Sequence, residues 1–278
     1  MRVLLERVFD HESAVLIYGF IGERLLGLGH EVASVASISI SGLSPQSFDV
    51  LISHGRVPRH WRDSIVCYGG NGWTRAQILG LLEDHGVATM PWKVVRRPAD
   101  LESLFDEWGV ERVLKKPSNS HGGDAVEVFT RESIGAVEWD PDDDVFCAEL
   151  DPASGDVYKI EVFNGIDTVT WMSDSPPIKD QMPGSYMKGL GGAYGDRRLI
   201  EAPVGILQGV VSCSRAAASL GVGYMSFDFM TNQDGDWVAI EANLELVATW
   251  WTAQFAFVKE RYAEGVLSLP QFASHVAT

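Results

Sequence analysis

The sequence predicts an α/β protein, with a small parallel sheet at the N-terminus and sheets of α+β character after it. Three observations support this fold class. In the first 70 residues, short apolar strands alternate with a helix in βαβ order. Between residues 112 and 165, strand patterns follow one another with only loops between them. Residues 227–243, FDFMTNQDGDWVAIEAN, have the pattern of two strands around an Asp-Gly turn.

Length and composition limit the class of protein. The chain has 278 residues, enough for one large domain or two to three small ones. Apolar residues make up 46% and charged residues 22%, as in globular proteins. The net charge of −16 disfavours non-specific binding to nucleic acid and to anionic membranes, so we expect neither partner.

The cysteines and the apolar segments indicate the cellular compartment of the protein. Cys67, Cys147 and Cys213 lie far apart without metal-type spacing, which indicates reduced thiols in a cytoplasmic protein. Glu6 and Arg7 interrupt the apolar start, and no uncharged run approaches the length of a membrane helix. We therefore expect no signal peptide and no membrane span.

The N-terminal elements are a helix among strands. Residues 2–8, 31–37 and 48–55 have strand patterns, and residues 13–28 form a helix that ends at GLGH. The segment GFIGERLLGLG in this helix lacks the GxGxxG spacing of a dinucleotide site. Its glycines fit helix packing and a C-cap better, and a dinucleotide site stays an alternative.

Shorter elements fill the rest of the chain. Residues 71–86 form a helix, with Asn71 or Thr74 as N-cap and Gly86 after its end. The further elements, in chain order, are a strand at 92–95, a helix at 99–108, strand–loop–strand at 112–129, strands at 144–151 and 157–165, a helix at 204–220 and an aromatic C-terminal helix. Residues 173–202 show little periodicity, and we expect this long loop to shape substrate choice.

The hairpin at 227–243 carries acids inside its strands. If the Asp-Gly dipeptide at 234–235 forms a two-residue turn, Asp228 lies opposite Glu241 and Ser226 lies opposite Asn243. These four side chains then share one face because side chains alternate along a strand. The other face is apolar and is formed by Phe227, Phe229, Val238, Ile240 and Ala242.

Two opposed acids repel each other unless something between them is positive. Carboxylates and an amide oxygen are ligands that Mg²⁺ accepts, so a divalent cation resolves the conflict. The alternative is a solvated hairpin face without a ligand. A three-residue turn would also shift the register and separate the two acids.

A second candidate element is the loop SNSHGG, which follows a strand with two lysines. Backbone N–H groups of such a loop can bind phosphate, and Ser120, Gly122 and Gly123 leave room for close approach. Lys115 and Lys116 alternate in direction, so only one of them faces the loop's ligand. The loop lacks the Walker A pattern, and lysines before glycine loops are also common on surfaces.

Four other polar residues stand at informative places. Arg75 lies in the first turn of a helix, where a positive charge is unfavourable, so it points either to solvent or towards a phosphate. Lys159 lies on a strand, and Glu149 and Asp156 flank a segment with the composition of a hinge.

Together these features resemble the ATP-grasp superfamily of ADP-forming carboxylate–amine ligases, which includes D-alanine–D-alanine ligases and ribosomal-protein glutamate ligases. The resemblance covers residues 71–245, and the βαβ start suits the family's N-terminal domain. Its most specific motif is an Asp followed across a hairpin by Glu-x-Asn, which Asp228, Glu241 and Asn243 match. LKKPSNSHGGDAV is similar to the family's lysine and glycine-loop element and selects Lys116 over Lys115.

The resemblance implies an ATP-grasp fold with three parts. These are an N-terminal α/β domain at 1–72, a small subdomain with the glycine loop at 73–150 and a C-terminal subdomain with the metal site at 151–278. The two sheet-containing subdomains enclose ATP. The implied ATP contacts are Arg75, Lys116, Ser120, Gly122, Gly123, Glu149, Leu150, Asp156 and Lys159, and the implied metal ligands are Asp228, Glu241 and Asn243. In this scheme Glu149 lies at the adenine hinge, Asp156 binds ribose, and Arg75 replaces a phosphate-binding lysine.

Two departures from the family concern the substrate side. In D-alanine ligases an Arg that steadies the acyl phosphate stands two residues before the first metal ligand, and here that position is Ser226. Either Lys188, Arg197 or Arg198 takes over this role, or the role is absent. The family's Pro-Gly after the Asn is replaced by LELVATWW, so the substrate does not carry over.

The implied chemistry is ATP-dependent ligation with one or two Mg²⁺ ions, for which Mn²⁺ could substitute. A carboxylate attacks the γ-phosphate and gives an acyl phosphate and ADP, and an amine or other nucleophile then displaces phosphate. The expected substrates are small-molecule or peptide carboxylates and amines, and a homodimer is compatible with the sequence. Two alternatives stay open: a non-catalytic, regulatory ATP-binding protein of the same fold, and a Rossmann oxidoreductase based on the N-terminal glycines.

Overall fold

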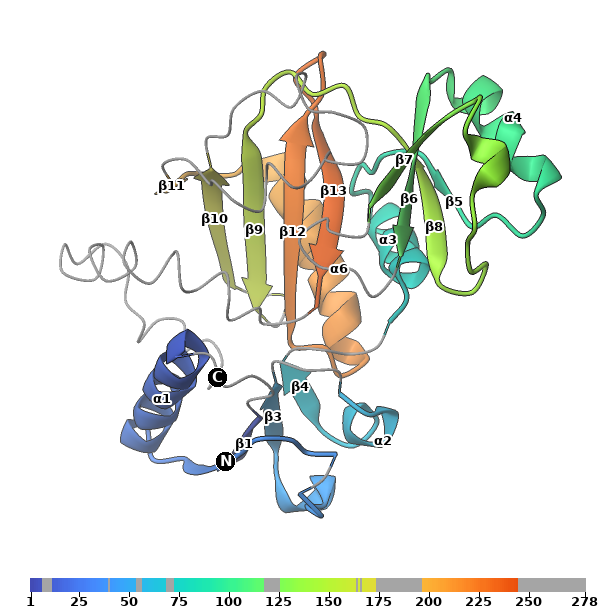
Figure 1. Cartoon of the computed structure of the whole chain (residues 1–278). Coiled ribbons are helices and arrows are strands. Elements are labelled where there is room, and N and C mark those ends of the chain that lie inside the picture. Colours follow the sequence, from blue (N-terminus) through green and yellow to red (C-terminus); the bar gives the residue numbers. More distant parts are fainter. Residues whose placement is uncertain are drawn as a thin grey trace.

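The computed structural model describes residues 1–6, 12–39, 41–53, 57–68, 73–117, 126–163, 165, 167–173 and 197–244. They form three sheets (Figure 1). None of the helices in these ranges has the length and apolar character needed to cross a bilayer. The predicted mixed α/β class is confirmed, with one parallel sheet and two antiparallel ones.

The N-terminal sheet is parallel and has the strand order β2-β1-β3-β4. Its elements are β1 (Arg2–Glu6), α1 (Glu12–Gly27), β2 (Glu31–Val35), the 3₁₀ turn η1 (Pro45–Ser47), β3 (Val50–Ser53), α2 (Arg59–Arg62) and β4 (Val66–Tyr68). Side chains of α1 such as Ile21 and Leu25 pack against Val3 and Leu5 on one face. Trp61 belongs to the cluster on the other face.

The glycines of α1 have structural roles. A Cβ on Gly22 would lie 3.3 Å from the Leu5 side chain, so this position lets the helix pack closely on the sheet. Gly29, just after the helix, has φ of +83°, which is the conformation of a helix C-cap. Helix packing and capping therefore account for these two glycines without a dinucleotide.

The middle sheet is antiparallel, with strand order β5-β8-β6-β7. Its elements are α3 (Arg75–Asp84), β5 (Trp92–Lys93), α4 (Ala99–Trp108), β6 (Arg112–Pro117), β7 (Glu127–Thr130), the 3₁₀ turn η2 (Ile134–Ala136) and β8 (Asp144–Ala148). Of the two predicted caps, Thr74 forms the N-cap of α3, in a capping box with Gln77. Leu101, Leu104 and Phe105 attach α4 to this sheet.

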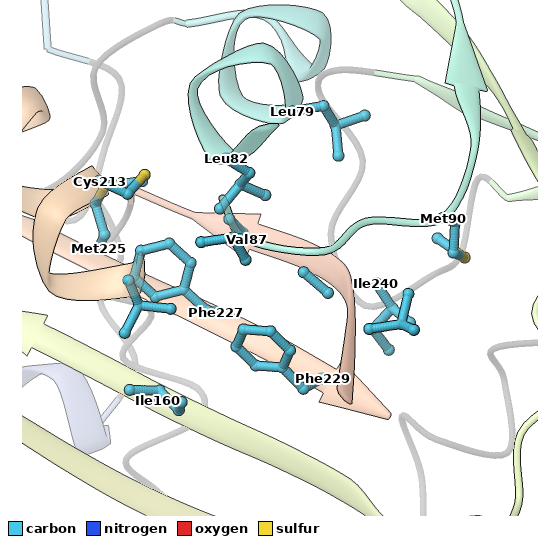
Figure 2. Close-up of a cluster of buried hydrophobic side chains, with 14 of the residues drawn as sticks. Leu79, Leu82, Val87, Met90, Ile160, Cys213, Met225, Phe227, Phe229 and Ile240 are labelled. Atoms are coloured by element: carbon cyan, nitrogen blue, oxygen red, sulfur yellow. The ribbon is translucent and has the colours of Figure 1, made fainter. Parts of the chain in front are cut away.

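The central sheet has the strand order β11-β10-β9-β12-β13, and all its pairs are antiparallel. Its elements are β9 (Val157–Phe163), β10 (Asp167–Ser173), β11 (Arg197–Leu199), α6 (Val204–Ser219), β12 (Tyr224–Thr231) and β13 (Trp237–Asn243). Figure 2 shows Cys213 of α6 and Leu82 of α3 packed over Phe227 of β12, within the largest apolar cluster. The predicted C-terminal helix and most of the loop at 173–202 lie outside the described residues.

Strand β12 connects the N-terminal sheet with the central sheet. Just before it, Val222 forms a parallel bridge with Cys67 of β4, through Cys67 N to Gly221 O at 2.9 Å and Gly223 N to Cys67 O at 2.7 Å. A Cβ on Gly223 would lie 2.8 Å from the Tyr68 ring, so only glycine allows this approach. Strand β12 therefore begins beside the N-terminal sheet and carries Asp228 near its middle, within the central sheet (Figure 1).

Candidate functional site

The acid pair of the hairpin is present as predicted. Asp228 lies opposite Glu241, and Ser226 lies opposite Asn243. The predicted two-residue turn is wrong, however. Asn232 N donates to Asp236 O at 2.9 Å, Gly235 N donates to Asn232 O at 3.0 Å, and Gly235 has φ of +84°. The loop therefore contains three residues and has its glycine in the left-handed region.

A β-bulge compensates for the longer turn. The register shifts by one residue between Asp228 and Phe229, at Ile240 on the partner strand. Between the shift and the turn, Phe229 lies opposite Ala239, and Met230 lies opposite Val238. The prediction that Val238 shares one face with Phe229 is therefore wrong, because Met230 and Phe229 alternate along β12. On the side of the bulge away from the turn, the strands have the predicted pairing. The bulge therefore places the carboxylates of Asp228 and Glu241 directly opposite each other.

Asp228 is buried, with 7% of its surface exposed. Its oxygens accept hydrogen bonds from Lys159 Nζ at 2.8 and 3.1 Å and from Asn243 Nδ2 at 3.3 Å. Burial raises the pKa of the Asp228 carboxyl; the Lys159 ammonium acts in the opposite direction, and Glu241 adds to the increase. Lys159 lies directly opposite Asp228 on β9, so the sheet register itself forms this ion pair.

Glu241 is held by an arginine from another element. Both terminal nitrogens of Arg75 donate to Glu241 Oε1 at 3.3 Å, and Arg75 Nε donates to the Pro117 carbonyl at 3.1 Å. Arg75 is only 8% exposed. Of the two predicted orientations, the one towards solvent is therefore wrong, and Arg75 points into the interior.

The two lysines of β6 point to opposite faces, as the alternation predicts. Lys116 Nζ donates to the Ile240 carbonyl at 3.0 Å, at the bulge. Lys115 Nζ donates to the Glu138 carbonyl at 2.8 Å, away from the hairpin. Burial lowers the pKa of the Lys116 ammonium. Lys116 is therefore the lysine of this strand that contacts the hairpin.

The donor set of this face can be tested against Mg²⁺. The described residues include no group of three or more His, Cys, Asp or Glu side chains suited to a metal. Two carboxylates, Asp228 and Glu241, and the Asn243 amide do lie together. Mg²⁺ typically binds one or two carboxylates and completes its shell with phosphate and water, so the set fits a Mg²⁺ that arrives with a nucleotide.

The predicted hinge segment lies beside the hairpin loop. Ala153 N donates to Thr231 O at 2.8 Å, and Gln233 Nε2 donates to Pro152 O at 2.9 Å. Asp156 accepts a hydrogen bond from Ser154 Oγ at 3.0 Å. Leu150, which is partly buried, packs against the largest apolar cluster. This segment connects the middle sheet with the central sheet.

Sequence reasoning missed some partners of the predicted residues. Glu149 forms a two-pronged ion pair with Arg112 of β6. Glu161, two positions after Lys159 on β9, is buried and accepts a hydrogen bond from the Tyr224 hydroxyl at 2.8 Å. The alternation of Lys159 and Glu161 in VYKIEVF was a usable signal for a second polar position on the same face.

For the remaining predicted site residues, the structure describes the backbone at most. Ser120, Gly122, Gly123 and Lys188 lie outside the described residues. The backbones of Arg197 and Arg198 form β11, opposite Ser173 and Met172 at the edge of the central sheet.

Comparison with known proteins then identifies the fold. No family model matches the sequence, and no curated protein matches it. Solved structures do match. The macrocyclase MdnC from Microcystis aeruginosa, bound with precursor peptide MdnA, has 12% identity and a TM-score of 0.64, with 99% of this chain and 98% of that chain covered.

Two further structures agree with this match. A RiPP-associated ATP-grasp ligase from Chryseobacterium gregarium, in complex with ADP and a leader and core peptide, has 11% identity and a TM-score of 0.63, covering 99% of this chain and 95% of that chain. D-alanyl-alanine synthetase A from Vibrio cholerae has 13% identity and a TM-score of 0.57, covering 88% of each chain. At these identities the likeness concerns the fold.

Proposed function

We propose that this chain, which has the ATP-grasp fold, is an ATP- and Mg²⁺-dependent ligase. It activates a carboxylate as an acyl phosphate and joins it to an amine or other nucleophile, releasing ADP and phosphate. One observation carries the proposal. The opposed carboxylates of Asp228 and Glu241 are contacted by two cations from different elements, Lys159 and Arg75, and the Lys116 ammonium lies one residue away, on the bulge carbonyl.

In this proposal ATP lies between the middle and central sheets. Three basic residues contribute positive charge for its phosphates: Arg75 from α3, Lys116 from β6 and Lys159 from β9. Each of them now contacts the hairpin through a long side chain, so a phosphate oxygen can replace the hairpin oxygen as its partner. The loop with Ser120, Gly122 and Gly123, which lies outside the described residues, would contribute backbone N–H groups to the phosphates.

The adenosine end of ATP would lie at the hinge. Glu149 and Leu150 would contact adenine, and Asp156 would bind the ribose hydroxyls. The Glu149 side chain points towards β6, because it forms an ion pair with Arg112. We therefore expect the backbone of the hinge, and not the Glu149 carboxylate, to form hydrogen bonds with the edge of the adenine ring. Hydrogen bonds from Ala153 and Gln233 hold this hinge against the hairpin that carries the acids.

Asp228, Glu241 and Asn243 would hold Mg²⁺. When bound, the ion supplies charge neutralisation for the β- and γ-phosphates and orients the transferred group. The residues of the chain then position the attacking carboxylate in line with the γ-phosphate, so catalysis consists of positioning and electrostatic stabilisation. Lys188, Arg197 or Arg198 would steady the acyl phosphate in place of the arginine that is absent at Ser226.

Peptides are the first substrates to test. The Microcystis macrocyclase binds a precursor peptide, and the Chryseobacterium ligase binds a leader and core peptide. The Vibrio synthetase supports small amino acids as a second set. We propose a cytoplasmic enzyme that acts on peptide or small-molecule carboxylates and amines, without nucleic acid or membrane partners, and a homodimer is compatible with this scheme.

The experiment is a screen for ATP-dependent phosphate release over peptides, amino acids and other carboxylates. Hydroxylamine is included because it traps an acyl phosphate as a hydroxamate whatever the natural nucleophile is. We expect phosphate, ADP and hydroxamate to form with at least one carboxylate in wild type, and to form at least about a hundredfold more slowly in Glu241→Gln. A chain that binds ATP and Mg²⁺ but releases no phosphate with any carboxylate would contradict the ligase.

That contrary result would favour a second function, a non-catalytic ATP-binding protein of the same fold. One feature supports this candidate: Ser226 stands where the D-alanine ligases have the arginine that steadies the acyl phosphate. Tight ATP binding without turnover is its signature.

A further inference from the structure

Arg75 connects two sheets at the proposed metal site. It is the first residue of α3, and its side chain reaches Pro117 at the end of β6 and Glu241 on β13. Strand β6 belongs to the middle sheet and β13 to the central sheet, so the guanidinium lies where the two sheets meet. The Arg75 and Glu241 side chains are only 9% and 16% exposed. A positive charge is unfavourable in the first turn of a helix, so these contacts, and not the helix, account for its position.

The contact with Glu241 does not have the best geometry for an arginine. Both terminal nitrogens of Arg75 donate to the same oxygen, Oε1, at 3.3 Å each. An arginine that pairs well with an acid forms two parallel hydrogen bonds to two oxygens, at about 2.7–2.9 Å. The Lys159–Asp228 pair has a distance of 2.8 Å and is fixed by the register of β9 and β12. Arg75 is therefore the cation that can change partners at the smaller cost.

The chain's own groups occupy both acids of the proposed metal set. Asp228 accepts hydrogen bonds from Lys159 Nζ and from Asn243 Nδ2. Glu241 accepts hydrogen bonds from Arg75. The two carboxylates and the two cations cancel in charge, so a divalent ion that entered alone would add two positive charges. Like charges a few ångström apart repel strongly in a buried site. These cations therefore disfavour a metal ion that arrives without a nucleotide.

A nucleotide reverses this balance. Its phosphates bring negative charge, and they offer pairs of oxygens that match the two-pronged donor geometry of a guanidinium. If Arg75 turns from Glu241 to a phosphate, the Glu241 carboxylate becomes available to a metal ion. The phosphates then compensate the charge that the metal ion adds.

We propose that Arg75 blocks the metal site in the nucleotide-free chain and opens it when a nucleotide binds, by exchanging Glu241 for a phosphate. This inference rests on the proposed function, in which Arg75 meets the phosphates of ATP and Glu241 holds the metal ion. It goes further because one side chain makes the two binding events depend on each other. Such coupling is reciprocal, so the metal ion also strengthens nucleotide binding.

The decisive measurement is Mn²⁺ binding without nucleotide, followed by electron paramagnetic resonance. Arg75→Gln removes the positive charge beside Glu241, so this variant should bind Mn²⁺ at least about tenfold more tightly than wild type. An arginine that only contacts phosphate, or only supports the fold, predicts unchanged or weaker Mn²⁺ binding in Arg75→Gln. Either of these two results would overturn the exchange of partners.

Two variants test whether the charge of Arg75 is the cause. Arg75→Lys keeps the positive charge and should bind Mn²⁺ alone about as weakly as wild type does. Arg59→Gln removes an arginine whose side chain is 85% exposed, so it is the matched control for net charge and should also behave like wild type. Tightening in either variant to the extent seen in Arg75→Gln would contradict a specific role for this charge.

A double variant tests whether Glu241 is the partner that matters. In a chain that already carries Glu241→Gln, adding Arg75→Gln should not tighten Mn²⁺ binding further, because the pair is already broken. The same tightening in both backgrounds would assign the effect to repulsion at a distance and would overturn the exchange. Thermal melts check that each variant is folded, and Arg75→Met replaces Arg75→Gln if the latter is unfolded at the temperature of the titration.

ADP allows the reciprocal measurement by calorimetric titration. ADP should bind more weakly to Arg75→Gln than to wild type, and the gain in ADP affinity that Mn²⁺ causes should be smaller in the variant. Part of this gain comes from direct contact between metal and phosphate, so the comparison of the two chains carries the test. An equal gain in both chains would contradict the coupling.

None of these measurements depends on turnover. If Arg75→Gln binds Mn²⁺ more tightly and no carboxylate gives phosphate release, the ligase fails and the exchange of partners stands. If wild type releases phosphate and Arg75→Gln binds Mn²⁺ no more tightly than wild type, the exchange fails and the ligase stands.

Discussion

Two buried carboxylates, one in each of two sheets, differ in the groups that hold them. Glu6, at the end of β1, is 2% exposed and accepts hydrogen bonds from the Ile38 backbone N–H at 2.6 Å and the Ser53 hydroxyl at 2.5 Å. Asp228, in β12, is similarly buried, and its closest partner is the ammonium of Lys159 at 2.8 Å.

The difference lies in whether the partners can be exchanged. The two described donors of Glu6 are a backbone N–H and a hydroxyl, both uncharged and both from the N-terminal part of the chain. The donors of Asp228 and Glu241 are the charged ends of long side chains, and the two acids lie opposite each other. A metal ion and phosphates can take over those interactions. Burial of an acid therefore does not by itself indicate a ligand site, whereas pairing with buried cations opposite a second acid is the arrangement on which the proposed metal site rests.

The largest effect is expected at the acid pair. Glu241→Gln keeps the shape of the side chain but removes its charge, so turnover should fall by roughly a hundredfold to a thousandfold or more. Stability should change little, because Glu241 is partly exposed and its bond to Arg75 is long. Steady-state ADP release and a thermal melt check both values. Full activity in this variant would remove Glu241 from the metal set.

The second effect concerns nucleotide affinity. Lys116→Ala removes the ammonium at the bulge, and we expect ATP to bind about tenfold to a hundredfold more weakly, which corresponds to roughly 1.4–2.8 kcal/mol. Lys115→Ala is the matched control, because Lys115 points to the other face of the same strand. Calorimetric titration with ATP and Mg²⁺ gives both constants. Equal affinities in the two variants would assign the phosphate contact elsewhere.

The third prediction concerns Glu6, the buried acid outside the proposed site. Glu6→Gln replaces one acceptor oxygen by an N–H₂ group among donors, so the chain should lose about 1–3 kcal/mol of stability. Turnover per folded molecule should stay at the wild-type value, since both described donors of Glu6 belong to the N-terminal part of the chain and not to the hairpin with the acid pair. Urea unfolding and a turnover assay well below the melting temperature test this. A selective loss of turnover would show that the two acids are not as different as proposed.

The smallest effect is a loss of stability at alkaline pH. Burial raises the pKa of the Cys67 thiol and of the Tyr68 phenol to about 12 each. The pKa values of both groups are higher in the folded chain than in the unfolded chain. Their contribution to the free energy of unfolding is therefore complete below the unfolded pKa values and is lost as pH rises towards 12. Stability should therefore fall above about pH 9, and less steeply in Cys67→Ala. Urea melts across this range provide the check, and parallel curves for the two chains would contradict it.

Much of the fold is local enough to be predicted from the sequence. The βαβ start, helix α3 with its Thr74 cap and the strands of the hairpin follow from periodicity and capping residues. The opposition of Asp228 and Glu241 was predicted from a turn that does not form. The correct pairing needs the bulge at Ile240. Distant segments contact the strand there: Ala239 N donates to Ala88 O, and Lys116 Nζ donates to Ile240 O.

The partners of the site residues could not be predicted. Lys159 was recognised as a basic strand residue, but its place opposite Asp228 follows from the pairing of β9 with β12, which are distant in sequence. The same long-range register places Glu161 beside Ser226. Arg112 reaches Glu149 because β6 and β8 are neighbours in the middle sheet. The residue types indicated a nucleotide and metal site. The order and register of the strands were needed to show that Lys159 pairs with Asp228 and Arg112 with Glu149.

The most direct test of the account is a titration of Mn²⁺ binding by electron paramagnetic resonance, in the presence of ADP. Wild type should bind Mn²⁺ in a saturable way, while Asp228→Asn and Glu241→Gln should lose most of that binding and Glu6→Gln should keep it. Equal Mn²⁺ binding by wild type, Asp228→Asn and Glu241→Gln would contradict the assignment of a metal to the acid pair.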